Sequence, residues 1–116
     1  MDKLQLLQRR LAQFAKDRDW EGFHSPKNLS MALSGECGEL IEHFQWLTET
    51  QSRHLSSDTL AKVRLEMADI QIYLLRLADV LEVDLVVAAN EKTTLNETRF
   101  PINKVKGQQK RAEEYN

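Results

Sequence analysis

The spacing of apolar residues predicts a first helix over residues 2–18. Apolar side chains recur there at three- and four-residue steps, which places them on one side of an α-helix: Leu4, Leu7, Leu11 and Phe14. Asp2 stands just before this stripe and is of a residue type that caps helix N-termini. Residues 19–24 lack the period, and we expect them to form a loop.

A second helix is predicted from Ser25-Pro26 to Leu47 or Thr48. Serine is a good N-cap, and proline suits the first helical turn. The polar residues 49–57 that follow are expected to form a loop. The apolar side chains of the helix predict a core face made of Leu29, Leu33, Cys37, Leu40, Ile41, Phe44 and Leu47.

A third helix is predicted from about Asp58, which would cap it, to about Leu81. It carries a second apolar strip beside the main one, and a domain of this size rarely covers a helix on two sides. We therefore expect contacts between copies of the chain on this helix. The main stripe is Leu60, Val63, Met67, Ile70, Leu74, Leu77 and Leu81, and the second strip is Leu65, Ile72 and Leu75.

A fourth helix is predicted from Asp84 to about Thr98, where Phe100-Pro101 stops it. No alternation of helices with strands indicates a parallel sheet. The sequence thus predicts an all-α, four-helix bundle-type domain over residues 1–101. Residues 102–116 are polar and basic, and we expect them to form a flexible tail.

Length and charge narrow the classes of protein. The chain has 116 residues, enough for one domain, and a net charge of −2, which argues against a generic nucleic-acid binder. No run of about 18 apolar residues predicts a membrane span, and the N-terminus lacks a signal-peptide pattern. The single cysteine, Cys37, suits a reducing compartment. We expect a cytoplasmic protein with neither a membrane nor a nucleic-acid partner.

Two pairs of acidic residues stand three apart, Glu36 with Glu39 and Glu66 with Asp69. Residues at this spacing share a helix face. At about 100° per residue, Glu36 falls inside the apolar stripe of the second helix and Glu39 at its margin. The other pair lies next to the main stripe of the third helix. The four carboxylates are therefore predicted to face the groove between the helices, although either pair alone also fits a solvated surface.

Acidic side chains that share a groove need a counter-charge. Two carboxylates about 5 Å apart repel each other by roughly 3 kcal/mol at an effective dielectric near 20. A divalent cation removes this repulsion, and a set of carboxylate ligands favours Mg²⁺, with Mn²⁺ as a substitute. Gly35 and Gly38, in mid-helix beside the first pair, indicate close approach by either another helix or a ligand.

Cationic and aromatic residues supply further candidates. Lys92, Asn96 and Arg99 recur on the inward face of the fourth helix, where they suit phosphate oxygens or internal salt bridges. The aromatic side chains suit either packing at the rim of the core or stacking on a nucleobase: Trp20, Phe23, Trp46 and Tyr73. His24 and His43 are candidate ligands or proton carriers, or structural residues. Cys37, on the predicted core face, is expected to be inert.

The spacing Glu36-Cys37-Gly38-Glu39, 26 residues, Glu66-Met67-Ala68-Asp69 resembles the paired acidic motif of the all-α nucleoside triphosphate pyrophosphohydrolases, the MazG-like superfamily. The match is closer to its dCTP pyrophosphatase-like branch. Gly35 stands where many relatives have a further glutamate, which bears on the number of metal ions. The resemblance extends in order through residues 18–24, 26–29, 35–40, 44–46, 66–70 and 83–85, and through Lys92, Asn96, Arg99, Phe100 and Pro101.

The resemblance implies a role for each of these residues. It implies Mg²⁺ ligands at Glu36, Glu39, Glu66 and Asp69, and an oligomer built on helical dimers, often a tetramer. It implies a base pocket and phosphate contacts made by Trp20, Trp46, Tyr73, Lys92, Asn96 and Arg99. We count His24 and Asn28, which lie inside the matching segments, with the substrate-binding residues.

The sequence thus predicts Mg²⁺-dependent cleavage of a (d)NTP, dCTP or another deoxynucleotide, to the monophosphate and pyrophosphate. Water attacks the α-phosphorus, and Glu39 is the first choice for the residue that orients or deprotonates it. The alternative is a helical dimerisation or regulatory module without catalysis. A di-iron bundle fits less well, because neither His43 nor His54 has a glutamate three residues before it.

Overall fold

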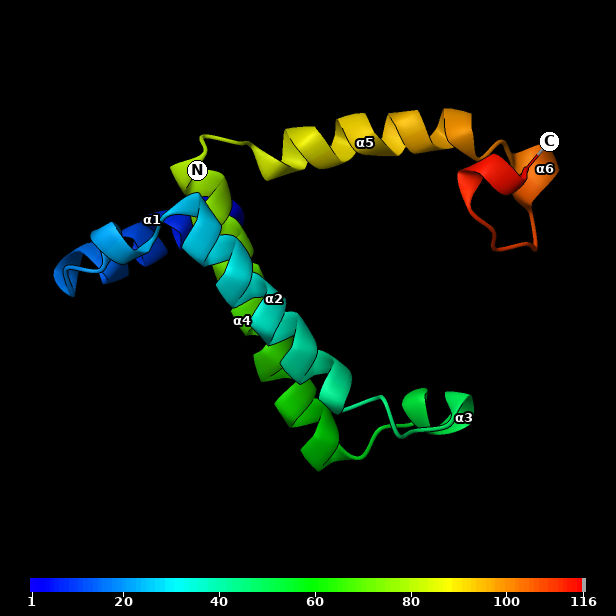
Figure 1. Cartoon of the computed structure of the whole chain (residues 1–116), viewed down its shortest axis with the longest axis horizontal. Helices are drawn as coiled ribbons and strands as arrows, with labels where there is room; N and C mark the ends of the chain where they lie inside the picture. The colour runs from blue at the N-terminus through cyan, green and yellow to red at the C-terminus, as the bar shows by residue number, and fades with distance from the viewer. Residues whose placement is uncertain (116) are drawn as a thin grey trace. The chain divides into compact units, whose positions relative to one another are not determined.

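The computed structural model describes residues 1–115, which form helices and turns with no strand among them (Figure 1). The all-α prediction is confirmed. The four long helices are α1 (Lys3–Asp17), α2 (Pro26–Glu42), α4 (Ser57–Val80) and α5 (Leu85–Arg99). The short ones are η1 (Glu21–Phe23), α3 (Glu49–Ser52), α6 (Ile102–Val105) and η2 (Ala112–Glu114). No helix in the described part of the chain is long and apolar enough to cross a membrane.

Side-chain caps define where the long helices begin. Asp2 accepts a hydrogen bond from the backbone N–H of Gln5, whose side chain bonds back to Asp2 in a capping box. The hydroxyl of Ser25 accepts from the N–H of Asn28 at 3.1 Å. A carboxylate oxygen of Asp84 accepts from the N–H of Val87 at 3.1 Å. These three predicted caps are confirmed.

Two predicted boundaries were wrong. The second helix ends at Glu42, because the next residues form turns whose N–H groups bond three residues back, His43 to Leu40 and Leu47 to Phe44. Thr48 then caps α3 in a capping box with Gln51, within a segment predicted to be a loop. The third long helix, α4, is capped by Ser56, two residues before the predicted cap Asp58.

The chain divides into two compact units, residues 1–82 and 83–116, and each is described by itself. In the first unit α2 and α4 lie side by side and run in opposite directions, and α1 packs against α4 (Figure 1). The side-chain amide of Gln8 on α1 donates to the carbonyl of Leu75 on α4 at 3.4 Å. The buried apolar residues of this unit are Ala15, Leu29, Val63, Leu75 and Ala78.

The core face of α2 is narrower than predicted. Leu29 is fully buried, and Leu33, Leu40 and Phe44 are partly buried. Cys37 and Ile41 were placed on this face and are exposed. Cys37 follows the inward Glu36 by one residue, about 100° around the helix, which carries it past the edge of the contact with α4. A Cβ at Gly35 or Gly38 would meet nothing within 4 Å, so packing within the chain does not require glycine there.

On α4 the predicted main stripe is divided between core and surface. Val63 is buried and Ile70 and Leu77 are partly buried, whereas the other members of the stripe are exposed: Leu60, Met67, Leu74 and, at the C-cap of the helix, Leu81. The predicted second strip is divided as well, because Leu75 is buried and Leu65 is 69% exposed. The helix therefore keeps uncovered apolar side chains on two sides, as the sequence predicted.

The second unit contains α5, α6 and η2. The chain leaves α5 at Phe100 and Pro101, as predicted. The Phe100 and Tyr115 rings then meet edge to face with centroids 5.8 Å apart. The Tyr115 hydroxyl accepts a hydrogen bond from the N–H of Lys110 at 2.7 Å. The segment predicted as a tail thus carries two short helices and contacts the end of α5.

Candidate functional site

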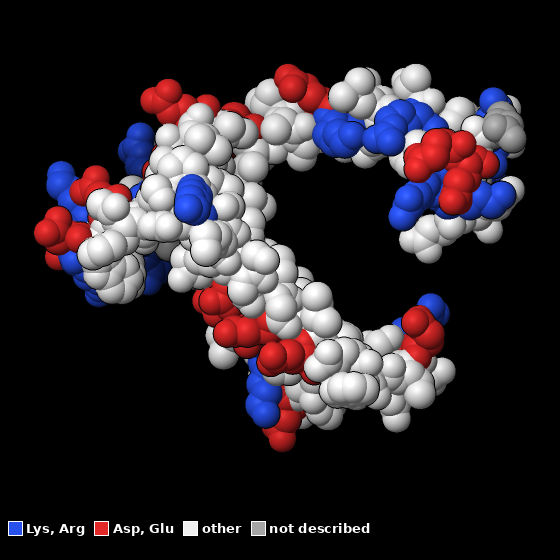
Figure 2. Space-filling view, in the orientation of Figure 1, with Lys and Arg blue, Asp and Glu red and all other residues white. Residues whose placement is uncertain are grey.

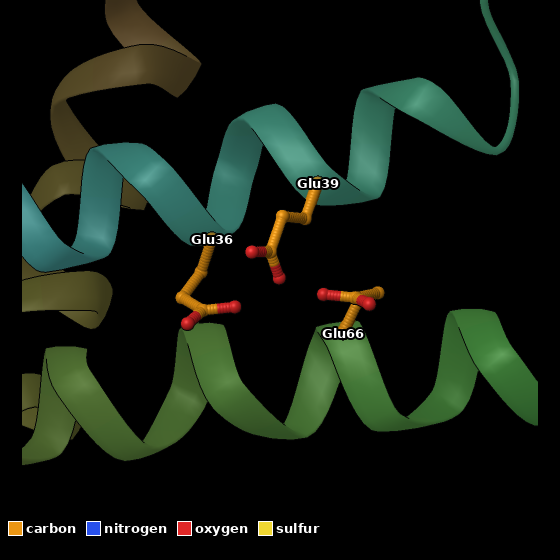
Figure 3. Close-up of side chains that lie close together, drawn as sticks. All are labelled: Glu36, Glu39 and Glu66. Atoms are coloured by element: carbon orange, nitrogen blue, oxygen red, sulfur yellow. The ribbon is translucent and has the colours of Figure 1, made fainter.

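Three glutamates from α2 and α4 converge in the groove between the two helices. Glu36 and Glu39 point from α2 toward α4, and Glu66 points back from α4 (Figure 3). One carboxylate oxygen of each lies within 4.8 Å of the others. Acidic side chains gather along this helix pair on the surface as well (Figure 2). The prediction that the two acidic motifs face a shared groove is thereby borne out for these three residues.

Two oxygens of this group are buried without a partner. Glu36 Oε2 and Glu66 Oε2 have almost no accessible surface and no hydrogen-bond donor within reach. The residues themselves are partly buried, whereas Glu39 is exposed at the margin of the groove, as its position on the helix predicted. A buried carboxylate oxygen with no donor is destabilising, because it has lost water and gained nothing in exchange.

The pKa values of the two inward glutamates reflect this environment. Burial, followed by the neighbouring Glu39 and then by the charges of Asp69 and Glu66, raises the pKa of Glu36 from 4.5 to about 7. Burial and Glu39 also raise the pKa of Glu66, and His43 opposes that rise. These carboxylates therefore bind a proton more readily than isolated glutamates do.

Asp69, the fourth predicted ligand, lies outside this compact group. Its side chain is partly buried on α4, three residues after Glu66. It is near enough for its charge to contribute to the raised pKa of Glu36. Its place as a metal ligand stays a prediction.

The donor chemistry of the group fits a hard divalent cation. The three side chains offer only carboxylate oxygens, the ligands that Mg²⁺ and Mn²⁺ prefer. A cation among them would satisfy the two orphaned oxygens and offset the mutual repulsion of the carboxylates. Because the protein supplies only a few ligands, the other coordination positions of the cation remain free for water and phosphate oxygens, as in other Mg²⁺ sites that bind nucleotides.

His43 is a neighbour of the acidic group to which sequence reasoning assigned no definite role. Its Nε2 lies 3.7 Å from Glu66 Oε1, an ion-pair separation that is longer than a hydrogen bond. The sequence could place His43 on the same helix face as the first acidic pair, since it follows Glu36 by seven residues and Glu39 by four, but it carried no signal for the approach to Glu66 on α4.

The predicted aromatic residues occupy different environments. The indole of Trp20 packs edge to face on Phe14, with ring centroids 5.7 Å apart. Its backbone N–H bonds to the carbonyl of Ala15, which fixes Trp20 at the end of α1. Trp46, in the turn after α2, is 86% exposed. Tyr73 is partly buried on α4, seven residues after Glu66 and on the same face. Of the three, Trp46 offers the largest free aromatic surface.

His24 and Asn28 already have partners within the chain. Arg76, only 8% exposed, donates from Nε to His24 Nδ1 at 3.3 Å and from Nη1 to Asp79 at 3.1 Å. Burial, and then the charge of Arg76, lowers the pKa of His24, which favours the neutral ring. The Asn28 side-chain amide donates to the carbonyl of Phe23 at 3.1 Å. Both residues brace the turn before α2, and a substrate-binding role for them stays a prediction.

The other predicted polar residues lie on α5, in the second unit. Lys92 and Arg99 are exposed, and Asn96 is partly buried. Lys and Arg side chains gather along α5 in Figure 2. Their role toward phosphate stays a prediction.

Comparison with known proteins gives matches that cover most of the chain. A family model described as the MazG-like family matches residues 31–115. Human dCTP pyrophosphatase 1 is 42% identical over 102 residues, which cover 86% of this chain and 60% of that protein. The mouse protein is 41% identical over 106 residues, 90% of this chain and 62% of that protein. The chain thus spans about three fifths of the length of these curated relatives.

A solved structure agrees with the sequence matches. The crystal structure of a pyrophosphatase from Archaeoglobus fulgidus superposes with a TM-score of 0.77 and 34% sequence identity, covering 87% of this chain and 94% of that one. The helical arrangement described above is therefore similar, over nearly the whole chain, to that of a protein identified as a pyrophosphatase.

Proposed function

The chain belongs to the MazG-like family, and from this premise we propose that it is a nucleoside triphosphate pyrophosphohydrolase. Its substrate is dCTP or another deoxynucleoside triphosphate, which it splits into the monophosphate and pyrophosphate with Mg²⁺. The observation that carries the proposal is the convergence of three glutamates, two of them with a buried and unpartnered oxygen. A purely structural helix pair gains nothing from that arrangement.

Glu36, Glu39 and Glu66 are the residues that would hold the metal, with Asp69 as the fourth ligand. Mg²⁺, when bound, supplies positive charge that offsets the charge of the triphosphate oxygens and of the leaving pyrophosphate. Mn²⁺ is expected to substitute, because the ligands are the same hard oxygens.

Glu39 is the candidate for the proton acceptor. It is exposed at the edge of the groove, so a water molecule can approach its carboxylate, whereas Glu36 and Glu66 each have an oxygen enclosed by the helices. In the proposed reaction Glu39 orients water toward the α-phosphorus and accepts its proton, and the bond to the β-phosphate oxygen breaks.

The exposed indole of Trp46 is the strongest candidate for stacking on the base, with Trp20 and Tyr73 beside it in the proposal. Lys92, Asn96 and Arg99 are proposed to contact the nucleotide. These roles follow from the family resemblance.

A cytoplasmic location is proposed on the ground of the lone cysteine.

We propose that the working form is a homo-oligomer, a dimer or a dimer of dimers. Exposed apolar side chains on α4 and at its C-cap repeat every seven residues, the period of helix-to-helix packing: Leu60, Met67, Leu74 and Leu81. An uncovered stripe of this length marks an interaction surface. The open space beside Gly35 and Gly38 is compatible with a helix of a second copy.

Incubation with dCTP and Mg²⁺ is expected to release dCMP and pyrophosphate in equal amounts. Separation of the products by ion-exchange chromatography, without added pyrophosphatase, distinguishes this cleavage from loss of the terminal phosphate. Orthophosphate and dCDP in place of these products would contradict the proposed bond.

The same assay across all ribo- and deoxyribonucleoside triphosphates defines the preferred base and sugar. EDTA is the matched control, because chelation is expected to stop the reaction. A module without catalysis would give no product with any of them, and its melting temperature would not rise with Mg²⁺.

A further inference from the structure

His43 is the C-cap residue of α2, and its backbone N–H bonds to the carbonyls of Leu40 and Ile41. This fixes the ring at the end of the helix, beside the groove. Its Nε2 lies 3.7 Å from Glu66 Oε1, and the two side chains are only 23% and 20% exposed. Of the basic side chains within the described chain, His43 is the one at ion-pair distance from Glu66.

The geometry points to His43 as a positioning residue that holds Glu66 for the cation, an inference that rests on the proposed metal site. The two oxygens of Glu66 have different surroundings: Oε1 faces the imidazole, and Oε2 is buried with no partner. The imidazole thus engages one oxygen and leaves the other for the metal. Side chains that contact a metal ligand, without binding the metal themselves, commonly fix the orientation of that ligand in this way.

Repulsion is the reason why Glu66 needs such a restraint. An oxygen of Glu66 lies within 4.8 Å of oxygens of Glu36 and Glu39, and repulsion between like charges at this distance favours conformations in which Glu66 turns away from the other two. A glutamate has three rotatable bonds with which to turn away. A ring nitrogen 3.7 Å from Glu66 Oε1 gives this side chain an attractive contact that works against the repulsion, so Glu66 is held in place before the cation arrives.

The position of His43 indicates that it is not itself a further ligand of the metal. The compact group of ligand atoms contains the three glutamates and not His43. The ring nitrogen lies 3.7 Å from Oε1 of Glu66, whereas the buried oxygen without a partner is Oε2. His43 is therefore inferred to act on the cation through Glu66, without binding it.

Three variants of the full chain test this role. His43→Leu removes the nitrogen and roughly keeps the bulk, His43→Phe also keeps a ring, and His43→Gln keeps a side-chain N–H at similar reach. Binding of Mn²⁺ alone is followed by the loss of its free EPR signal. Melting temperature in EDTA reports folding separately.

We expect His43→Leu and His43→Phe to bind Mn²⁺ about 10–100-fold more weakly than the natural protein, the usual effect of removing a partner of a ligand. His43→Gln is expected to stay within about threefold, because its side-chain N–H can take the place of the ring nitrogen near Glu66. A merely structural histidine would lower melting temperature in all three without this ordering. Electron spin-echo spectra of the Mn²⁺ complex are expected to lack coupling to an imidazole nitrogen.

Natural-like binding by the two apolar variants would overturn the positioning role while leaving the metal site intact. Binding by His43→Gln as weak as by His43→Leu would overturn it as well. Imidazole coupling that disappears in the variants would make His43 a ligand and contradict the inference. If the natural protein fails to bind Mn²⁺ at millimolar concentration, the proposed metal site fails, and the inference falls with it.

Discussion

Glu36→Gln is expected to lower pyrophosphate release by at least about 100-fold, because it removes a proposed metal ligand, and loss of a residue that only contacts a ligand already costs about 10–100-fold. The same substitution is expected to raise the melting temperature of the metal-free protein at pH 8. Glu36 is charged there, has an unpartnered buried oxygen and stands among other carboxylates. A neutral amide removes this repulsion and can donate to Glu39 or Glu66. A substitution that lowers activity and raises the stability of the metal-free protein is the result expected for a residue that binds the metal.

The stability of the metal-free protein should depend on pH in a defined direction, and Glu36→Gln should change that dependence. The pKa of Glu36 is about 7 in the folded protein, against 4.5 for an ordinary glutamate. Between these values the folded state holds a proton that the unfolded chain has released, so raising the pH lowers stability. We expect the melting temperature of the metal-free protein to fall as pH rises through this window, and to fall less in Glu36→Gln. Calorimetry in EDTA across this window measures both slopes.

Glu42→Gln is the matched control for this substitution. Glu42 is an exposed glutamate on the same helix and lies outside the converging group. It is expected to keep natural activity and the natural dependence of stability on pH. Full activity of Glu36→Gln, or a melting temperature that Mg²⁺ still raises as in the natural protein, would contradict the assignment of Glu36.

Met67→Glu is expected to dissociate the proposed oligomer. Met67 is 57% exposed in the single chain and stands inside the apolar row on α4. In a symmetric assembly a new carboxylate at this position appears in every copy, and placing like charges opposite each other costs several kcal/mol. Association should weaken by more than about 100-fold. Light scattering after gel filtration is expected to give a single-chain mass of 13.5 kDa for the variant and a multiple of it for the natural protein.

Leu6→Glu is the control for added charge. Leu6 is an exposed apolar residue on α1, away from the row on α4, and the variant should keep the natural mass. A natural mass for Met67→Glu would place the contact between copies elsewhere, for example at Leu65 on the other side of α4. A single-chain mass for the natural protein would remove the proposed oligomer altogether.

The inward orientation of Glu36 could be predicted from the sequence because helical phase is a local property. Residues on one helix keep a fixed angular relation, so a glutamate in the same phase as Leu29 and Leu40 must face the same neighbour. The same phase placed Glu39 at the margin, where the structure has it. Local chemistry also sufficed for the caps at Asp2, Ser25 and Asp84.

Features that depend on which other helix of the chain packs against a given helix could not be predicted in this way. Phase shows that Met67 and Val63 belong to one broad stripe, but only the placement of α2 decides that Val63 is buried and Met67 exposed. The exposure of Cys37 has the same origin. The approach of His43 to Glu66 joins two helices, and periodicity within one helix carries no information about the opposite one.

The central claim is that the glutamates of α2 and α4 share one divalent cation, and anomalous diffraction from crystals grown with Mn²⁺ tests it most directly. We predict an anomalous peak in the α2–α4 groove, about 2.0–2.5 Å from carboxylate oxygens of Glu36, Glu39 and Glu66. Bound Mn²⁺ found only at other positions, with these three side chains turned apart, would contradict the account.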